Sequence, residues 1–140
     1  MIAPESWTFT VPGEPFAWQR ATVVRGVHFT PRKTADYQRL VGMVARQAYS
    51  GPPLSGAVSV DVVAVFPRLS TSRAKGREVY AVQRRHDVDN LAKSILDGIT
   101  KAGLWADDGQ VADLRVRKFR AALGEAPHVE VTVSRLRDNP

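Results

Sequence analysis

The sequence predicts a single α+β domain over residues 1–140, with elements in the order β-α-β-α-β-β and a mixed or antiparallel sheet that carries two helices. Three observations predict this class. A chain of 140 residues has room for one hydrophobic core. Segments with apolar residues at every second position alternate with two segments in which apolar residues recur every three to four positions. Neither an internal repeat nor a linker divides the chain.

The first half of the chain begins with a strand. Residues 7–11 alternate between apolar and polar side chains, which predicts a half-buried strand. Residues 22–30 predict a small hairpin around Gly26. Residues 33–49 carry apolar side chains at helical spacing, and Thr34 is the expected N-cap of this helix.

A valine-rich strand and a basic loop come next. Residues 57–66 alternate well and predict a strand. Residues 67–86 show no sustained period, so we expect a loop, and it is longer than a compact domain usually keeps without a function. The basic side chains of this loop that we expect to contact phosphate are Arg68, Arg73, Lys75, Arg77, Arg84 and Arg85.

The second half predicts a helix and two closing strands. Residues 90–102 place apolar side chains on one side of a helix, and Gly103 is the expected stop. Residues 111–119 and 128–136 predict strands joined by a glycine-containing turn.

Charge is the most informative feature of the composition. Twenty Lys and Arg residues against 14 Asp and Glu give a net charge of +6, so polyanions are the first partners to consider. Residues 87–113 contain six aspartates and two lysines, a net charge of −4, which leaves +10 for the rest of the chain. A basic protein has therefore kept an acidic segment at its centre.

Several classes are excluded or disfavoured. The chain has no cysteine, which excludes disulfides and thiolate zinc sites. Its three histidines are too scattered for a zinc site, and no serine is placed for a nucleophile elbow. The chain also has no glycine-rich phosphate loop, and we expect no small-molecule cofactor. No apolar run is long enough to span a membrane and the N-terminus does not resemble a signal peptide, so we expect a cytoplasmic protein of bacterial or phage origin.

The acidic segment points to a divalent metal. Asp87 and Asp89 lie two residues apart just before the second helix, and their carboxylates repel each other unless a cation or proton neutralises them. Oxygen ligands of this kind suit Mg²⁺. Lys93 and Asp97 follow Asp89 at i+4 and i+8 on one helix edge, where an ammonium can orient a carboxylate or stabilise charge on a phosphate.

A third carboxylate is within reach of the first two. Asp107 and Asp108 follow the helix, which is about 20 Å long at ~1.5 Å per residue. Residues 103–108, extended at ~3.3 Å each, are just long enough to return that distance. The third ligand can therefore come from the same chain, or a neighbouring subunit can supply it.

A structural interpretation of the same residues stands beside the catalytic one. Asp87 or Asp89 can cap the helix, and Lys93 can form surface ion pairs with Asp89 and Asp97. Asp107 and Asp108 can form a turn. On that interpretation the protein is a non-catalytic nucleic-acid binder.

The acidic segment resembles the RusA family of Holliday junction resolvases, endonucleases that cut four-way DNA junctions. The residues that carry the resemblance are Asp87, Asp89, Asn90, Leu91, Lys93, Asp97, Gly103, Asp107, Asp108, Gln110 and Val111. The resemblance implies a RusA-like fold, and it implies that Asp87, Asp89 and Asp108 are catalytic, metal-binding carboxylates with Lys93 as a supporting catalytic group. It also implies a homodimer that uses Mg²⁺ or Mn²⁺.

We therefore predict a metal-dependent, structure-selective DNA endonuclease that resolves four-way junctions by paired symmetric nicks. A small Mg²⁺-dependent nuclease acting on flaps or forks is a second alternative, after the non-catalytic binder. The residues expected to support the site are Asn90, Asp97, Asp107 and Gln110. Residues 16–20 depart from the basic segment of phage relatives, and Trp18 there suits either stacking on unpaired bases or core packing.

Overall fold

The computed structural model describes residues 5–19, 22–29, 31–81 and 86–136. Its elements are strands β1 (Ser6–Pro12), β2 (Thr22–Val24) and β3 (Val27–Phe29), helix α1 (Arg32–Ala48), strands β4 (Val58–Phe66) and β5 (Glu78–Val79), helix α2 (Val88–Lys101), the 3-10 turn η1 (Asp108–Gln110), and strands β6 (Val111–Arg120) and β7 (His128–Arg135). The predicted strands, hairpin and two helices are all present, with boundaries within two residues of those expected.

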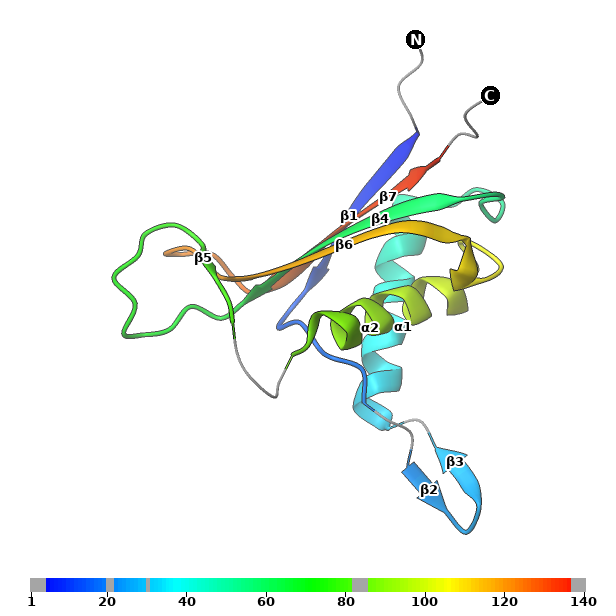
Figure 1. Ribbon diagram of the computed structural model, residues 1–140, viewed down its shortest axis with the longest axis horizontal. Helices are drawn as coiled ribbons and strands as arrows, with labels where there is room; N and C mark the ends of the chain where they lie inside the picture. The colour runs from blue at the N-terminus through cyan, green and yellow to red at the C-terminus, as the bar shows by residue number, and fades with distance from the viewer. Residues whose placement is uncertain (1–4, 20–21, 30, 82–85, 137–140) are drawn as a thin grey trace.

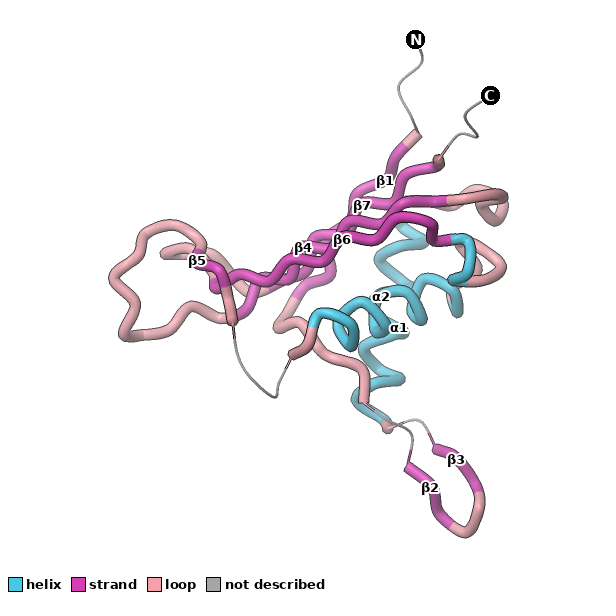
Figure 2. Tube along the Cα trace, viewed as in Figure 1, coloured by secondary structure: helices cyan, strands magenta, loops and turns pink. Residues whose placement is uncertain are grey.

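A five-stranded sheet with the order β1-β7-β4-β6-β5 forms the body of the protein. β4 and β6 run parallel, joined through α2, whereas the other neighbours in the sheet run antiparallel. Both helices lie on one side of the sheet, and the β2–β3 hairpin extends away from it (Figures 1 and 2). The mixed sheet with two helices that the sequence predicts is confirmed.

Alternation in β4 and β7 explains which face the helices cover. Val60, Val62 and Ala64 of β4 are buried, as are Val129, Val131 and Val133 of β7, and these side chains form one core cluster with α1 and α2. The residues between them, such as Asp61 and Thr132, are only partly buried. The sheet therefore needs helices on one face alone.

Helix α1 begins earlier than its sequence signals indicate. The expected N-cap, Thr34, is fully buried inside the first turn, and the N-cap is Pro31. Pro31 has an extended backbone, and its carbonyl accepts the first helical hydrogen bond from Ala35 N at 3.0 Å. The fixed φ of proline sets the entry of the chain into the helix, so a side-chain cap is absent here.

Two glycines let α1 and α2 cross closely. A Cβ atom on Gly98 of α2 would lie 2.8 Å from the carbonyl oxygen of Gln38 and 2.9 Å from the side chain of Val41. A Cβ atom on Gly42 of α1 would lie 3.0 Å from the carbonyl oxygen of Gly98. The crossing fixes α2, which carries Asp89 and Asp97, against the rest of the core.

The basic loop has more structure than its irregular sequence indicates. β5 pairs with Phe119 and Arg120 of β6, a strand that the sequence analysis did not predict. Arg68 Nη2 donates to the carbonyl oxygens of Ser72 and Ala74 at 2.8 and 3.1 Å, which closes the loop on itself. In the described ranges, no helix is both long enough and apolar enough to cross a membrane.

Candidate active site

The start of α2 presents two carboxylates to solvent. Asp87 is the N-cap residue of α2, but its side chain makes no capping hydrogen bond. Asp89 follows in the first turn, where its Oδ1 accepts a hydrogen bond from the backbone of Asn90 at 2.9 Å. Both residues are exposed. The capping interpretation therefore fails for Asp87, whose carboxylate oxygens remain directed to the surface.

Lys93 lies one turn further along α2, between Asp89 and Asp97. Among the described residues, neither aspartate comes within the 4.0 Å of Lys93 that an ion pair requires. The Lys93 ammonium instead lies over the ring of Trp18, 4.7 Å from its centroid. Asp97 accepts a long hydrogen bond of 3.4 Å from Gln38 of α1, a contact that no sequence signal indicated. The surface ion pairs of the structural interpretation are not formed.

The turn η1 is built by Asp107 and Gln110. Asp107 Oδ1 accepts from Gly109 N at 3.2 Å, and Gln110 Oε1 accepts from Asp107 N at 3.3 Å, which together form a capping box. Gln110 Nε2 also donates to the carbonyl oxygens of Leu54 and Gly56, at 2.9 and 3.0 Å. The two predicted supporting residues thus hold the turn and fix it to the chain before β4.

Asp108 is the carboxylate that this turn presents. It is exposed, and no capping role is assigned to its side chain. A hydrogen bond with the Asp107 side chain raises the pKa of Asp108, and partial desolvation adds to the increase. The negative charge of Asp97 also raises this pKa, whereas the Lys93 ammonium lowers it. Asp108 is therefore electrostatically coupled to the middle of α2.

The acidic residues lie in two neighbouring groups. Asp108 interacts with Asp97 and Lys93, while Asp87 and Asp89 lie at the start of α2. Within the single chain, Asp87, Asp89 and Asp108 do not bring ligand atoms within 4.8 Å of one another as a group of three. Exposed carboxylate oxygens without cationic partners are nevertheless the donor set that a hard divalent cation requires.

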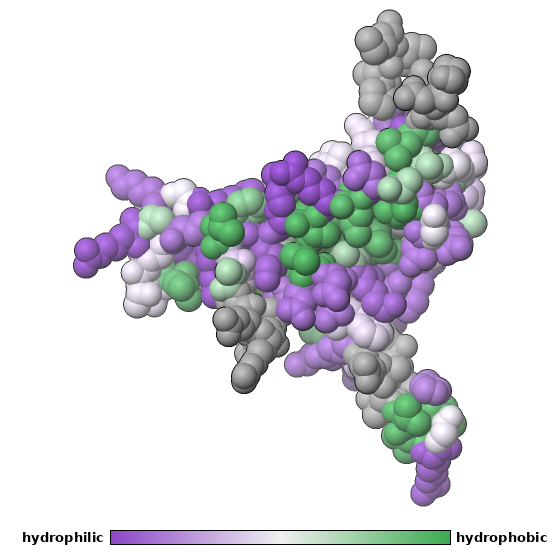
Figure 3. All heavy atoms as spheres, in the orientation of Figure 1, coloured by the Kyte–Doolittle hydropathy of each residue, from purple (hydrophilic) through white to green (hydrophobic). Residues whose placement is uncertain are grey.

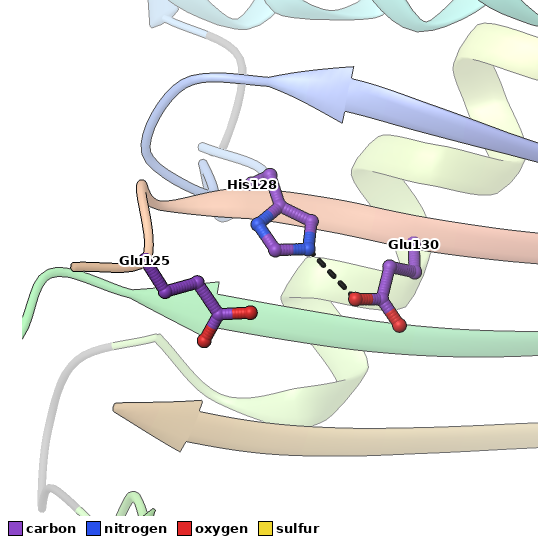
Figure 4. Close-up of side chains that lie close together, drawn as sticks. All are labelled: Glu125, His128 and Glu130. Atoms are coloured by element: carbon purple, nitrogen blue, oxygen red, sulfur yellow. Dashed lines mark hydrogen bonds and ion pairs between the residues drawn. The ribbon is translucent and has the colours of Figure 1, made fainter. Parts of the chain in front are cut away.

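A second acidic group does converge. Glu125, His128 and Glu130 place ligand atoms within 4.8 Å of one another, the one such group found in the described part of the chain (Figure 4). A cation already holds it together, because Arg77 Nη2 lies 2.6 Å from Glu125 Oε2 and 2.7 Å from Glu130 Oε2. His128 Nε2 pairs with Glu130 at 2.7 Å. We name these four residues the guanidinium-bridged cluster. It was not predicted, because Arg77, which joins the two glutamates, lies 48 residues before Glu125 in the chain.

The predicted DNA-binding residues fall into three groups. Arg68 and Arg77 are engaged within the protein, the first by loop carbonyls and the second by the guanidinium-bridged cluster. Arg73 and Lys75 have exposed side chains. Arg84 and Arg85 lie outside the described residues.

Three aromatic residues near the site can also be placed. Trp105 anchors the connection after α2, because it is buried and its indole donates to Thr100 Oγ1 at 2.7 Å. Trp18 is half-buried, and its backbone N donates to the carbonyl oxygen of Asn90 at 2.9 Å. Phe16 packs against Tyr37 of α1, with ring centroids 5.8 Å apart. The segment of residues 16–19 therefore lies beside the start of α2.

One protein family matches most of this chain. Residues 12–134 match the family model of endodeoxyribonuclease RusA. The chain is 35% identical over 136 residues to the uncharacterized protein YqaN of Bacillus subtilis strain 168, covering 89% of this chain and 93% of YqaN. It is 46% identical over 50 residues to the crossover junction endodeoxyribonuclease RusA of Escherichia coli K12, and equally so to that of Enterobacteria phage 82. That match spans 36% of this chain and 42% of those two proteins.

Proposed function

This chain belongs to the RusA family of endodeoxyribonucleases, and from that membership we propose that it is a metal-dependent endonuclease that resolves four-way DNA junctions by paired, symmetric nicks. The observation that carries the proposal is the set of exposed carboxylates at Asp87, Asp89 and Asp108. Each stands in the family pattern, and none is neutralised by an ion pair within the described residues of a chain whose net charge is +6.

Asp87, Asp89 and Asp108 would hold Mg²⁺, with Mn²⁺ as a substitute. When bound, such an ion supplies Lewis-acid stabilisation of a scissile phosphate and favours ionisation of an attacking water. The carboxylates themselves keep this end of α2 anionic, so a phosphate approaches productively only when the cation is present. Asp107 and Gln110 position Asp108 through the hydrogen bonds of η1.

Lys93 would act as an electrostatic catalyst. Its ammonium lies over the Trp18 ring and forms no ion pair with Asp89 or Asp97, so its charge remains available near Asp108, whose pKa it lowers. A fixed cation beside a phosphate stabilises the charge that develops as the phosphodiester is attacked.

Arg73 and Lys75 are the described residues of the basic loop that best suit phosphate contact, because their side chains are exposed. We propose that they hold the DNA backbone together with Arg84 and Arg85, which lead directly into Asp87 in the sequence. Binding to such contacts weakens steeply with salt, because counterions are released.

A homodimer would supply the two equivalent sites that paired nicks need. The feature that supports it is the edge of β6, since β5 pairs only with its last two residues and leaves the edge before them without a strand partner in the described chain. Apolar side chains gather over β6 and α2 on this side of the molecule, and Leu114 of β6 is 42% exposed (Figure 3). An unpaired strand edge with apolar neighbours is a template for pairing with another chain.

The sequence of β6 suits antiparallel pairing with a second copy of itself. Pairing centred on Leu114 sets Asp113 opposite Arg115 of the partner subunit, and the same contact repeats by symmetry. It also brings η1 of one subunit to the Lys118 end of the other. Lys118 Nζ donates to the carbonyl oxygen of His86 at 3.0 Å, beside Asp87. Asp108 of the partner subunit would then complete the ligand set of Asp87 and Asp89.

Mixed dimers test this arrangement. Asp89→Asn and Asp108→Asn subunits are each expected to be inactive alone. If the site combines two subunits, the mixture regains single-strand nicking, because one of the two sites in a mixed dimer contains only native ligands. A mixture that stays inactive, although mixed dimers form, would show that each site lies within one chain.

The function itself is tested with a labelled four-way junction, a flap, a fork and a duplex, each incubated with Mg²⁺ or with a chelator. We expect symmetric nicks in the junction only when Mg²⁺ is present. Faster cleavage of the flap or fork would favour the flap or fork nuclease. Tight junction binding without cleavage of any substrate would favour the non-catalytic binder.

A further inference from the structure

A cavity of about 330 Å³ lies beside Asp87 and has no assigned role. Residues 16–19, which follow β1, form one side of it, and the start of α2 forms the other. Phe16 and Trp18 contribute aromatic side chains, Gln19 and Asn90 contribute carboxamides, and His86 contributes an imidazole. The lining thus combines flat aromatic side chains with hydrogen-bonding groups at the edge of the acidic site.

The aromatic side chains are fixed by contacts behind them. Trp18 N donates to the carbonyl oxygen of Asn90 at 2.9 Å, and the Lys93 ammonium lies 4.7 Å from the centroid of the Trp18 ring. Phe16 packs against Tyr37. Both helices therefore hold this segment in place, and the cavity does not depend on a ligand for its shape.

The chemistry of these groups selects a class of ligand. A carboxamide offers both a donor and an acceptor, which matches the edge of a planar heterocycle. Aromatic rings stack on nucleobases whatever their identity. The carboxylate of Asp87 in the same lining disfavours a second anion, so a free phosphate is a poor candidate. A neutral, planar ring with hydrogen-bonding groups on its edge fits all three features.

We propose that this cavity takes the nucleobase adjacent to the scissile phosphate after that base has left its stack at the junction. The proposal rests on the nuclease function above, because it places the base at the edge of the catalytic carboxylates. Trp18 stacks against the base, and Gln19 and Asn90 bind its edge. The cavity therefore sets which nucleotide the enzyme prefers at the cut.

The first test compares four junctions that differ only in the base pair at the cut position. We expect wild-type protein to cleave them at unequal rates. Gln19→Ala should bring the four rates together, whereas Gln47→Ala, a matched change on the exposed part of α1, should leave their ranking unchanged. Trp18→Ala should slow the preferred junction about tenfold or more, and Trp18→Phe should retain most of the rate, since stacking survives.

The second test needs no cleavage, which separates this proposal from the nuclease function. A junction carrying 2-aminopurine at the cut position is bound in the presence of a chelator. Stacking on an indole quenches 2-aminopurine, so we expect weaker fluorescence in the wild-type complex than in the Trp18→Ala complex. Equal fluorescence in the two complexes, or an unchanged ranking of rates in both Trp18→Ala and Gln19→Ala, would overturn the proposal. Absence of cleavage with quenching intact would contradict the nuclease function alone.

Discussion

Two groups of acidic side chains differ in what neutralises them. The guanidinium-bridged cluster after β6 is closed, because Arg77 contacts both Glu125 and Glu130. The other group is open, since Asp87 and Asp89 at the start of α2 and Asp108 in η1 have no ion-pair partner in the described chain. The convergent carboxylates therefore make a structural contact, and we propose the exposed carboxylates without ion-pair partners as the metal ligands.

Side chains of both acidic groups also hold loops in place. Arg77 ties the basic loop to the turn before β7, so an arginine that the sequence assigns to DNA has a structural partner. Asp107 and Gln110 hold η1 but leave Asp108 exposed. At η1, Asp107 thus builds the turn while Asp108 beside it stays exposed.

The largest expected effect separates the two groups directly. Asp89→Asn should lower the junction cleavage rate about a thousandfold or more, because a metal ligand is lost, while junction binding is retained or tightened. Glu130→Gln, a matched change in the guanidinium-bridged cluster, should leave cleavage near the wild-type rate. Single-turnover cleavage and binding in a chelator measure both quantities. Comparable losses of cleavage in the two variants would show that the two acidic groups do not differ in their role in cleavage.

A smaller loss is expected at Lys93. Lys93→Ala should slow cleavage about a hundredfold, since a fixed cation beside the phosphate is removed, and should weaken binding much less. Lys101→Ala removes a lysine from the same helix whose ammonium donates to Gln38 instead. That control should keep the cleavage rate. If the rate and the affinity of Lys93→Ala fall in parallel, Lys93 is a DNA contact only.

We expect substitutions in the guanidinium-bridged cluster to change the stability of the protein rather than its cleavage rate. The hydrogen bond from Arg77 lowers the pKa of Glu125 to about 2, with a further contribution from the backbone of Ala122. An acid whose pKa is lowered on folding stabilises the protein above its unfolded pKa, so this contribution is present above about pH 4.5 and is lost as the pH falls toward 2. Urea unfolding should show Glu125→Gln less stable than wild type near neutral pH, with the difference vanishing near about pH 2.

The smallest effect concerns the salt dependence of binding. Lys75→Ala should reduce the slope of log K against log salt by about 0.9, the loss of one phosphate contact. Arg77→Ala should instead lower the free energy of unfolding and change the slope less, because its guanidinium is held by Glu125 and Glu130. Binding isotherms across a salt series compare the two variants. Equal slopes for wild type and Lys75→Ala would show that Lys75 makes no phosphate contact.

Regular periodicity explains how much of the fold could be predicted. Alternating valines in β4 and β7 and the apolar side of α2 gave correct elements, since burial on one face imposes those periods. β5 was missed because its two residues form a strand only through pairing with distant β6. The N-cap of α1 was assigned to the wrong residue, because Pro31 caps the helix and Thr34 is buried in its first turn.

The candidate site was predictable as a motif but not as a geometry. The spacing of Asp87, Asp89 and Lys93 follows from sequence, whereas the position of Asp108 depends on how η1 packs against α2. Trp18 beside Asn90 and Arg77 beside Glu130 join segments far apart in the chain. No local pattern encodes such contacts.

Metal binding distinguishes the exposed carboxylates from the guanidinium-bridged cluster. Mn²⁺ titrated into wild-type protein, Asp89→Asn and Glu130→Gln can be followed by the loss of the free-ion electron paramagnetic resonance signal. We expect wild type and Glu130→Gln to take up Mn²⁺ with similar affinity and Asp89→Asn to take up none. Uptake that survives Asp89→Asn and disappears in Glu130→Gln would place the metal in the guanidinium-bridged cluster and contradict the assignment of Asp89 as a metal ligand.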